Sequence, residues 1–139
     1  MKRKRKHILC SLAGITTAYA LAEHDPSKQI ILIDDGEICS GETGRTIAHL
    51  QIEYDDYYHV IEHMFGENNA RLVCQSNHEA VDFIEKTVRK ENIDCEFERL
   101  PAYLIPCKDS HIKDLIDKEF KSASKAGMTV ELIEDSSKL

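Results

Sequence analysis

The 139-residue sequence contains no tryptophan, no long apolar run and no C-x-x-C cysteine pair. A membrane-spanning helix needs about 20 consecutive apolar residues, and no stretch approaches that length. The basic start is followed by too few apolar residues for a secretory signal peptide. An odd number of cysteines, five here, is typical of reduced thiols in an intracellular protein. We therefore expect a globular, cytoplasmic protein without a membrane partner.

Positive charge is concentrated at the start of the chain. The net charge is −7, although residues 2–6 form the basic run KRKRK, so the remainder is more acidic still. An acidic surface repels the phosphates of nucleic acid, which argues against nucleic acid as a partner of the main body. The basic run fits a nuclear-import or anionic-surface tag, and it also fits a solvated arm without a function of its own.

The apolar spacing predicts an α/β chain whose first part has strand–helix–strand order and whose remainder is mostly helical. The first helix is apolar nearly all round, which predicts burial, and the strand after it resembles a parallel strand covered on both faces. A helix cap is expected at Ser110 and a helix end at Gly127. The predicted helices are Ala13–Glu23, Tyr54–Phe65, Asn69–Lys90 and His111–Lys125, and the predicted strands are Gln29–Ile33, two short ones around Pro101, and Met128–Ile133.

The turn before the first helix is a degenerate form of the dinucleotide-binding fingerprint G-x-G-x-x-G. Gly14 occupies the third glycine position, which permits close packing of helix and strand, whereas Leu9 and Ser11 replace the first two glycines. The Ser11 hydroxyl can donate to a phosphate, although its side chain crowds the approach. Asp34 follows Gly14 by 20 residues, at the end of the next strand, where an acidic residue binds ribose hydroxyls.

A second candidate phosphate loop, SGETGRT, spans Ser40–Thr46. Its glycines allow close approach of the backbone, its hydroxyls can donate hydrogen bonds, and Arg45 supplies positive charge. Each of these signals is weak when taken singly.

Together with AGITTAYALAE and ILIDDGEICSGETGRTIAHL, these motifs resemble the N-terminal FAD-binding segment of FAD-dependent oxidoreductases of the D-amino-acid oxidase (DAO) type. The resemblance extends from Ala13 to Glu134 and implies a partial Rossmann-like βαβ unit, followed by helices and short strands of an incomplete second region. It implies FAD as cofactor and, in full-length relatives, a small amine or amino-acid substrate. His49 would lie towards the flavin, or else be a surface histidine. The candidate FAD-binding residues are Ser11, Gly14, Asp34, Ser40, Gly41, Thr43, Gly44, Arg45, Thr46 and His49.

The chain departs from the family pattern at its start and in its length. KRKRKHIL stands where the family has an apolar first strand, so we expect the Gln29–Ile33 strand to have an unpaired edge. The expected organisation is a basic arm with a degenerate first strand over 1–12, a truncated FAD-dependent oxidoreductase domain over 13–134, and a polar tail over 135–139. No catalytic residue is assigned, and we expect no activity from this chain alone. The alternative is a non-catalytic remnant that binds a nucleotide or another protein.

A third hypothesis comes from HVIEH, His59 to His63, which matches the H-x-x-E-H pattern of inverted zinc proteases. On a helix the two histidines would share a face, with Glu62 as general base. A third ligand would have to come from Glu131 or Glu134. Five-residue matches are common by chance, so we expect no metal site.

Overall fold

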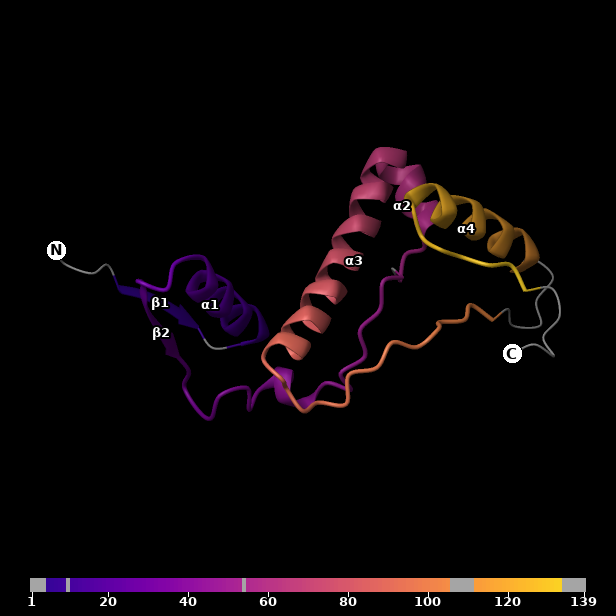
Figure 1. Ribbon diagram of the computed structural model, residues 1–139. Coiled ribbons are helices and arrows are strands. Elements are labelled where there is room, and N and C mark those ends of the chain that lie inside the picture. Colours follow the sequence, from indigo (N-terminus) through magenta and orange to yellow (C-terminus); the bar gives the residue numbers. More distant parts are fainter. Residues whose placement is uncertain (1–4, 10, 54, 106–111, 134–139) are drawn as a thin grey trace. The chain divides into compact units, whose positions relative to one another are not determined.

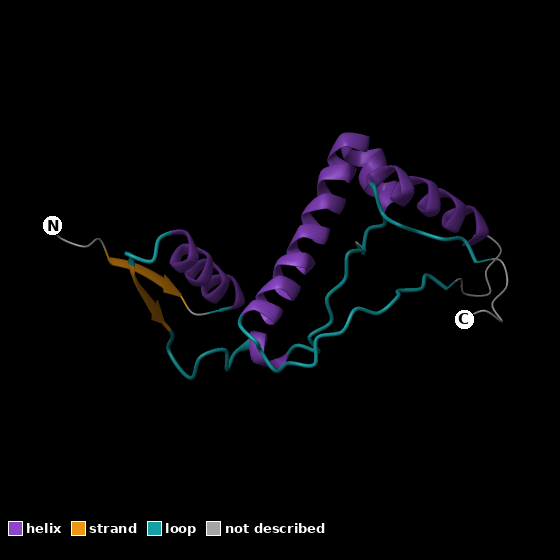
Figure 2. Cartoon of the chain, in the orientation of Figure 1, coloured by secondary structure: helices purple, strands orange, loops and turns teal. Residues whose placement is uncertain are grey.

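The computed structural model describes residues 5–9, 11–53, 55–105 and 112–133. The chain divides into two compact units, Met1–His49 and Leu50–Leu139. Figure 1 labels the main helices and strands, and Figure 2 shows that strands occur in the first unit whereas the second is built from helices and loops. Within the described ranges, no helix combines the length and apolar character needed to cross a membrane.

The first unit contains two parallel strands joined by a helix. Strand β1 (Arg5–Leu9) pairs with β2 (Gln29–Ile33), and His7 lies opposite Ile31 in the register. Helix α1 (Leu12–His24) connects the strands and packs against both (Figure 1). The prediction that the basic start leaves β2 without a partner on this edge is therefore wrong. Backbone groups make the hydrogen bonds of a parallel ladder, so basic side chains do not prevent the pairing.

Burial in the first unit is shallower than the apolar sequence predicts. Only Gly14 and Ala18 of α1 are buried, and the side chains of Leu32 and Ile33 in β2 are 40% and 42% exposed. The predictions of a buried helix and of a strand covered on both faces are wrong for the described residues. A single helix covers only one face of a two-stranded sheet, so the remaining apolar surface stays in contact with solvent.

The second unit is a cluster of three helices, α2 (Tyr58–Phe65), α3 (Glu67–Lys90) and α4 (Ile112–Ala126). All three pairs of helices are in contact. Alanines at the contact surfaces lack bulky side chains and allow the helix backbones to approach closely, while Tyr58 fills the largest buried position. The core consists of Tyr58, Ile61, Ala70, Cys74, Ala123 and Ala126.

Helix α2 begins at Tyr58, four residues after the predicted start at Tyr54, a residue that lies outside the described ranges. Tyr57 precedes the helix with a positive φ of 58° and provides no side-chain cap. The cap comes instead from Glu119 on α4. Its Oε1 accepts from the backbone N–H of Tyr58 at 2.7 Å, and its Oε2 accepts from that of His59 at 3.0 Å. A carboxylate at a helix N-terminus satisfies free N–H groups and interacts favourably with the helix dipole.

The strands predicted for the second unit are absent from residues 93–105 and 128–133, both of which are described (Figure 2). Their β-branched and aromatic residues favour strands, but this preference depends on a neighbouring strand to pair with. Met128 and Val130 pack against the helical core instead.

Gly127 ends α4 as predicted, with a φ of 103° that suits glycine. The predicted cap at Ser110 lies outside the described residues.

Candidate functional site

The N-terminus of α1 is where the two predicted cofactor segments meet. Ser11 caps the helix, and its Oγ accepts from the backbone N–H of Gly14 at 3.4 Å. The N–H of Leu12 donates to Oγ1 of Thr43, also at 3.4 Å. This second bond connects positions 31 residues apart and brings the Ser40–Thr46 loop to the beginning of the helix. A helix N-terminus offers free N–H groups and the positive end of a dipole, which favour an anion.

Close approach of the backbone within the loop explains why glycine occupies position 44. A short 3-10 helix covers Glu42–Arg45, and the N–H of Gly44 donates to the carbonyl of Gly41 at 3.2 Å. A Cβ on Gly44 would lie 2.3 Å from the carbonyl oxygen of Cys39, which is closer than a real Cβ can approach. Gly41 has nothing within 4 Å of the corresponding position. The loop therefore requires glycine at position 44 for steric reasons and tolerates a methyl group at 41.

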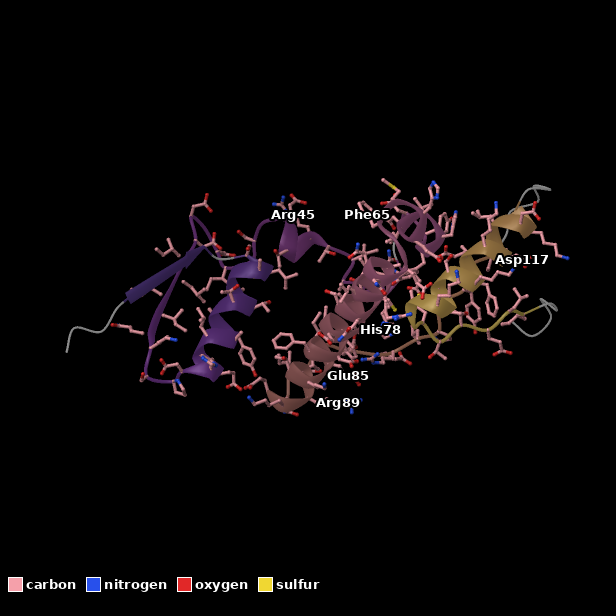
Figure 3. The ribbon with its side chains drawn as sticks, turned by 90° about the horizontal axis from the view of Figure 1, so that it is seen from above. Arg45, Phe65, His78, Glu85, Arg89 and Asp117 are labelled. Carbon is pink, nitrogen blue, oxygen red and sulfur yellow. The ribbon has the colours of Figure 1, made fainter. Side chains whose placement is uncertain are left out.

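Asp34 and Arg45, the two charged candidate residues of the first unit, differ in their contacts. Asp34 follows β2 directly, is half-buried, and accepts from the N–H of Asp35 at 2.9 Å. Arg45 is exposed and forms no ion pair with any described residue; Figure 3 shows its side chain on the loop. An Arg guanidinium presents several N–H donors to an anion, so Arg45 is available to bind one.

The remaining predicted residues have local or solvent-exposed environments. The N–H of Ser40 donates to the carbonyl of Glu37 at 3.0 Å, and Oγ1 of Thr46 accepts from the N–H of Ala48 at 3.2 Å. His49 is exposed, with no hydrogen bond to another described residue. The described contacts thus join Thr43 to the helix N-terminus but place neither Asp34 nor His49 in contact with it.

Leu12 is part of this site, although its side chain gives no sign of a binding role. It acts through its backbone N–H, and its side chain is 64% exposed. Side-chain identity therefore gave no signal. Its position, the first residue of a helix that follows a fingerprint turn, was the available clue.

The H-x-x-E-H segment serves to join helices in the second unit. His59 Nδ1 lies 2.8 Å from Oε2 of Glu119, and Lys125 donates to Oε1 of Glu62 at 2.8 Å. Ser122 also donates to Glu62. The hydrogen bond from Lys125 has the larger effect on the pKa of Glu62, and that from Ser122 the smaller. Both lower this pKa below its ordinary value. Among the described residues there is no group of three side chains that could hold a metal ion. Glu62 and His59 therefore connect α2 to α4, and the geometry gives the zinc-protease hypothesis no support.

Burial shifts the pKa values of two titratable groups in the helical core. Desolvation raises the pKa of the Tyr58 hydroxyl and that of the Cys74 thiol. Tyr58 donates to the carbonyl of Ile52 at 3.1 Å, and Asn77 donates to the same carbonyl at the same distance. A buried thiol with a raised pKa is a poor nucleophile, so Cys74 acts as a packing residue.

Comparison with known proteins identifies the family. Residues 12–138 match the family described as DAO, FAD dependent oxidoreductase. The protein YhfW of Bacillus subtilis (strain 168), named as a Rieske 2Fe-2S iron-sulfur protein, is 32% identical over 124 residues. That alignment covers 89% of this chain and 24% of YhfW, so the chain spans about a quarter of the relative's length. No solved structure matches the chain. Since the family match extends over most of the sequence, the chain belongs to the FAD-dependent oxidoreductases of the D-amino-acid oxidase (DAO) type.

Proposed function

We propose that this chain is an N-terminal FAD-binding portion of an amine or amino-acid oxidoreductase, in a partial Rossmann-like βαβ unit. The observation that carries the proposal is the hydrogen bond from Leu12 N–H to Thr43 Oγ1. It joins the helix N-terminus of a β1–α1–β2 unit to a loop rich in glycine and hydroxyl groups. Both segments have the chemistry needed to bind phosphate.

The groups in this unit fit the diphosphate and ribose of FAD. The first turn of α1 offers N–H groups, of which that of Ala13 has no partner among the described residues, whereas Thr43 and Ser11 bind those of Leu12 and Gly14. Arg45 provides a guanidinium without an ion-pair partner in the described chain. Asp34, at the end of β2, would accept from ribose hydroxyls. Hydroxyl groups bound to α1 make these amides less available to a phosphate, so we expect modest affinity.

The bound flavin would accept a hydride from a carbon atom next to an amine nitrogen, and the protein would supply binding and orientation. Ser40, Gly41, Gly44 and Thr46 would follow the cofactor with backbone and hydroxyl groups, and His49 would lie towards the flavin. We assign no catalytic residue. The substrate would be a small amine or amino acid, as the family implies.

The name of YhfW suggests an electron acceptor for such a reaction. A Rieske 2Fe-2S centre accepts one electron at a time, in contrast to oxygen, which forms hydrogen peroxide in oxidases. We propose an iron-sulfur acceptor as the alternative to oxygen. Reduced flavin in the FAD-loaded protein would then be reoxidised faster by ferricyanide, a one-electron acceptor, than by dissolved oxygen. Equal or faster reoxidation by oxygen would argue for an oxidase.

FAD titration of the purified chain tests the proposal directly. We expect saturable binding by calorimetry, and Arg45→Ala should weaken it roughly five- to tenfold, the effect of losing one charge-assisted contact. Arg89→Ala in the second unit is the matched control, because Arg89 is exposed and lies on α3. The result would favour the non-catalytic alternative if wild-type protein binds no FAD, or if Arg45→Ala and Arg89→Ala bind FAD with equal affinity. Metal analysis of the same sample tests the zinc hypothesis.

A further inference from the structure

Residues 94–105, which follow α3, form an extended segment with few attachments (Figure 2). Within this segment, Arg99 alone makes a hydrogen bond or ion pair to the rest of the described chain. Phe97 is half-buried, whereas Leu100 is 72% exposed and Ile105 66% exposed. The segment therefore lacks the hydrogen-bonded ladder or apolar burial that normally fixes the path of a chain.

Two carboxylates on one face of α3 bind the Arg99 guanidinium. Nε of Arg99 lies 2.7 Å from Oε2 of Glu85, and Nη2 lies 2.5 Å from Oδ1 of Asp82. Side chains three positions apart are neighbours on a helix surface, so Asp82 and Glu85 present their charges together. The planar guanidinium can donate to both at once, which a lysine ammonium does less well. Glu85 also pairs with Arg89 from the next turn of α3, and Figure 3 labels both residues.

We infer that Arg99 is an electrostatic latch that holds residues 94–105 beside α3 and presents an apolar stretch to solvent. Leu100 and Tyr103–Ile105 make up that stretch. The latch depends on ion pairs at a partly exposed site, and salt weakens such pairs by screening. Raised ionic strength or loss of the guanidinium would release the segment while the helical cluster stays folded.

Backbone 15N relaxation of the full chain tests the latch, because heteronuclear NOE values report motion on the picosecond-to-nanosecond timescale. In Arg99→Gln, we expect these values to fall for residues 97–100 and to remain unchanged within α3. Arg89→Gln is the matched control: it removes the other arginine bound to Glu85 but leaves the Arg99 contacts in place. Addition of about 0.5 M NaCl, which shortens the Debye length to roughly 4 Å, should lower the wild-type values part of the way towards the Arg99→Gln profile.

Arg99→Lys separates charge from geometry and should give intermediate NOE values. The proposal is overturned if residues 97–100 are equally ordered in Arg99→Gln and Arg89→Gln, or if they are already mobile in wild-type protein at low salt. It is also overturned if Arg99→Gln unfolds α3 while Arg99→Lys behaves as wild type in every residue, since Arg99 would then stabilise the helix itself. None of these readouts involves FAD, so the latch and the proposed function can fail separately.

Discussion

The backbone N–H of Leu12 donates to the hydroxyl of Thr43 across 31 positions of sequence. Through this bond the loop that follows β2 returns to the beginning of the helix that precedes β2. A single side-chain oxygen thus connects the two segments on which the proposed FAD site depends.

Thr43→Val removes this hydroxyl while keeping the shape of the side chain. We expect a loss of about 0.5–1 kcal/mol in the free energy of unfolding, the usual net value of one hydrogen bond. FAD affinity should fall roughly three- to fivefold, because the loss of the loop's attachment to the helix outweighs the gain of a free Leu12 N–H. Urea denaturation and FAD titration measure the two effects. Thr87→Val is the control, since Thr87 lies on α3 and its hydroxyl donates to the carbonyl of Phe83 on the same helix. Identical behaviour of the two variants would contradict the assigned role of Thr43.

Gly44→Ala tests the close approach inside the loop. Because its Cβ would lie 2.3 Å from the Cys39 carbonyl oxygen, the backbone must shift. We expect destabilisation of about 1–3 kcal/mol and weaker FAD binding, as for other overpacked sites. Gly41→Ala should leave the stability nearly unchanged, since no protein atom lies within 4 Å of the added methyl group. Thermal unfolding of the pair provides the measurement, and a Gly41→Ala variant as unstable as Gly44→Ala would disprove the steric argument.

Glu119→Ala removes the cap of α2. Two backbone N–H groups lose their acceptor in a partly buried place, as does the ring of His59. We expect a loss of about 2–3 kcal/mol in the free energy of unfolding, more than for an ordinary helix cap. Glu79→Ala is the control, because Glu79 is exposed and, within the described part of the chain, accepts only from Gln75 on its own helix. A difference below about 0.5 kcal/mol between the two variants would show that the cap contributes little.

The Glu62 carboxylate makes stability depend on pH. Its ion pair with Lys125 lowers its folded-state pKa below the ordinary value of 4.5. A lowered pKa contributes stability that is present above 4.5 and is lost as the pH falls through the folded-state value. The difference in urea midpoint between wild type and Glu62→Gln should therefore be largest near neutral pH and shrink below about pH 4. A constant difference from pH 7 to pH 3 would mean that ionisation of Glu62 is not linked to folding.

We expect no turnover from this chain even with saturating FAD. Leu9 and Ser11 replace two glycines of the fingerprint, and hydroxyls already bind two amides at the start of α1. Both features impair the close approach of a diphosphate to the backbone. Hydrogen peroxide release from D-amino acids, glycine and N-methylated amino acids is the assay, together with ferricyanide reduction. Reproducible turnover above a free-FAD control would show that the chain is catalytically competent by itself.

Helix positions were predictable because apolar spacing and end signals are local properties of the sequence. The predicted helix Asn69–Lys90 corresponds to α3 at Glu67–Lys90, and the predicted strand Gln29–Ile33 has the bounds of β2. Long-range pairing was not predictable in the same way. The stretch Arg5–Leu9 pairs through its backbone, which side-chain composition does not reveal. The stretch 128–133 has no strand beside it among the described residues, and its Met128 and Val130 pack on the helical core.

The candidate site was predictable in its parts but not in its assembly. The glycines and hydroxyls of Ser40–Thr46 stand out in the sequence, and Gly44 has a steric role that its surroundings explain. The contact of Thr43 with Leu12 is invisible because it uses a backbone N–H. The H-x-x-E-H motif misleads for the opposite reason. Its side chains have metal-binding chemistry, yet α4 supplies Glu119 and Lys125 as their partners.

The cap that Glu119 places on α2 has a consequence for the order of folding. Helix α2 has only eight residues, too few to be stable by itself in water, and its acceptor lies about 60 positions further along the chain. Helix α3, three times as long, can begin to form from local contacts. The first turn of α2 is therefore completed only after α4 has docked. The amide protons of Tyr58 and His59 would become protected from exchange only in step with those of α4.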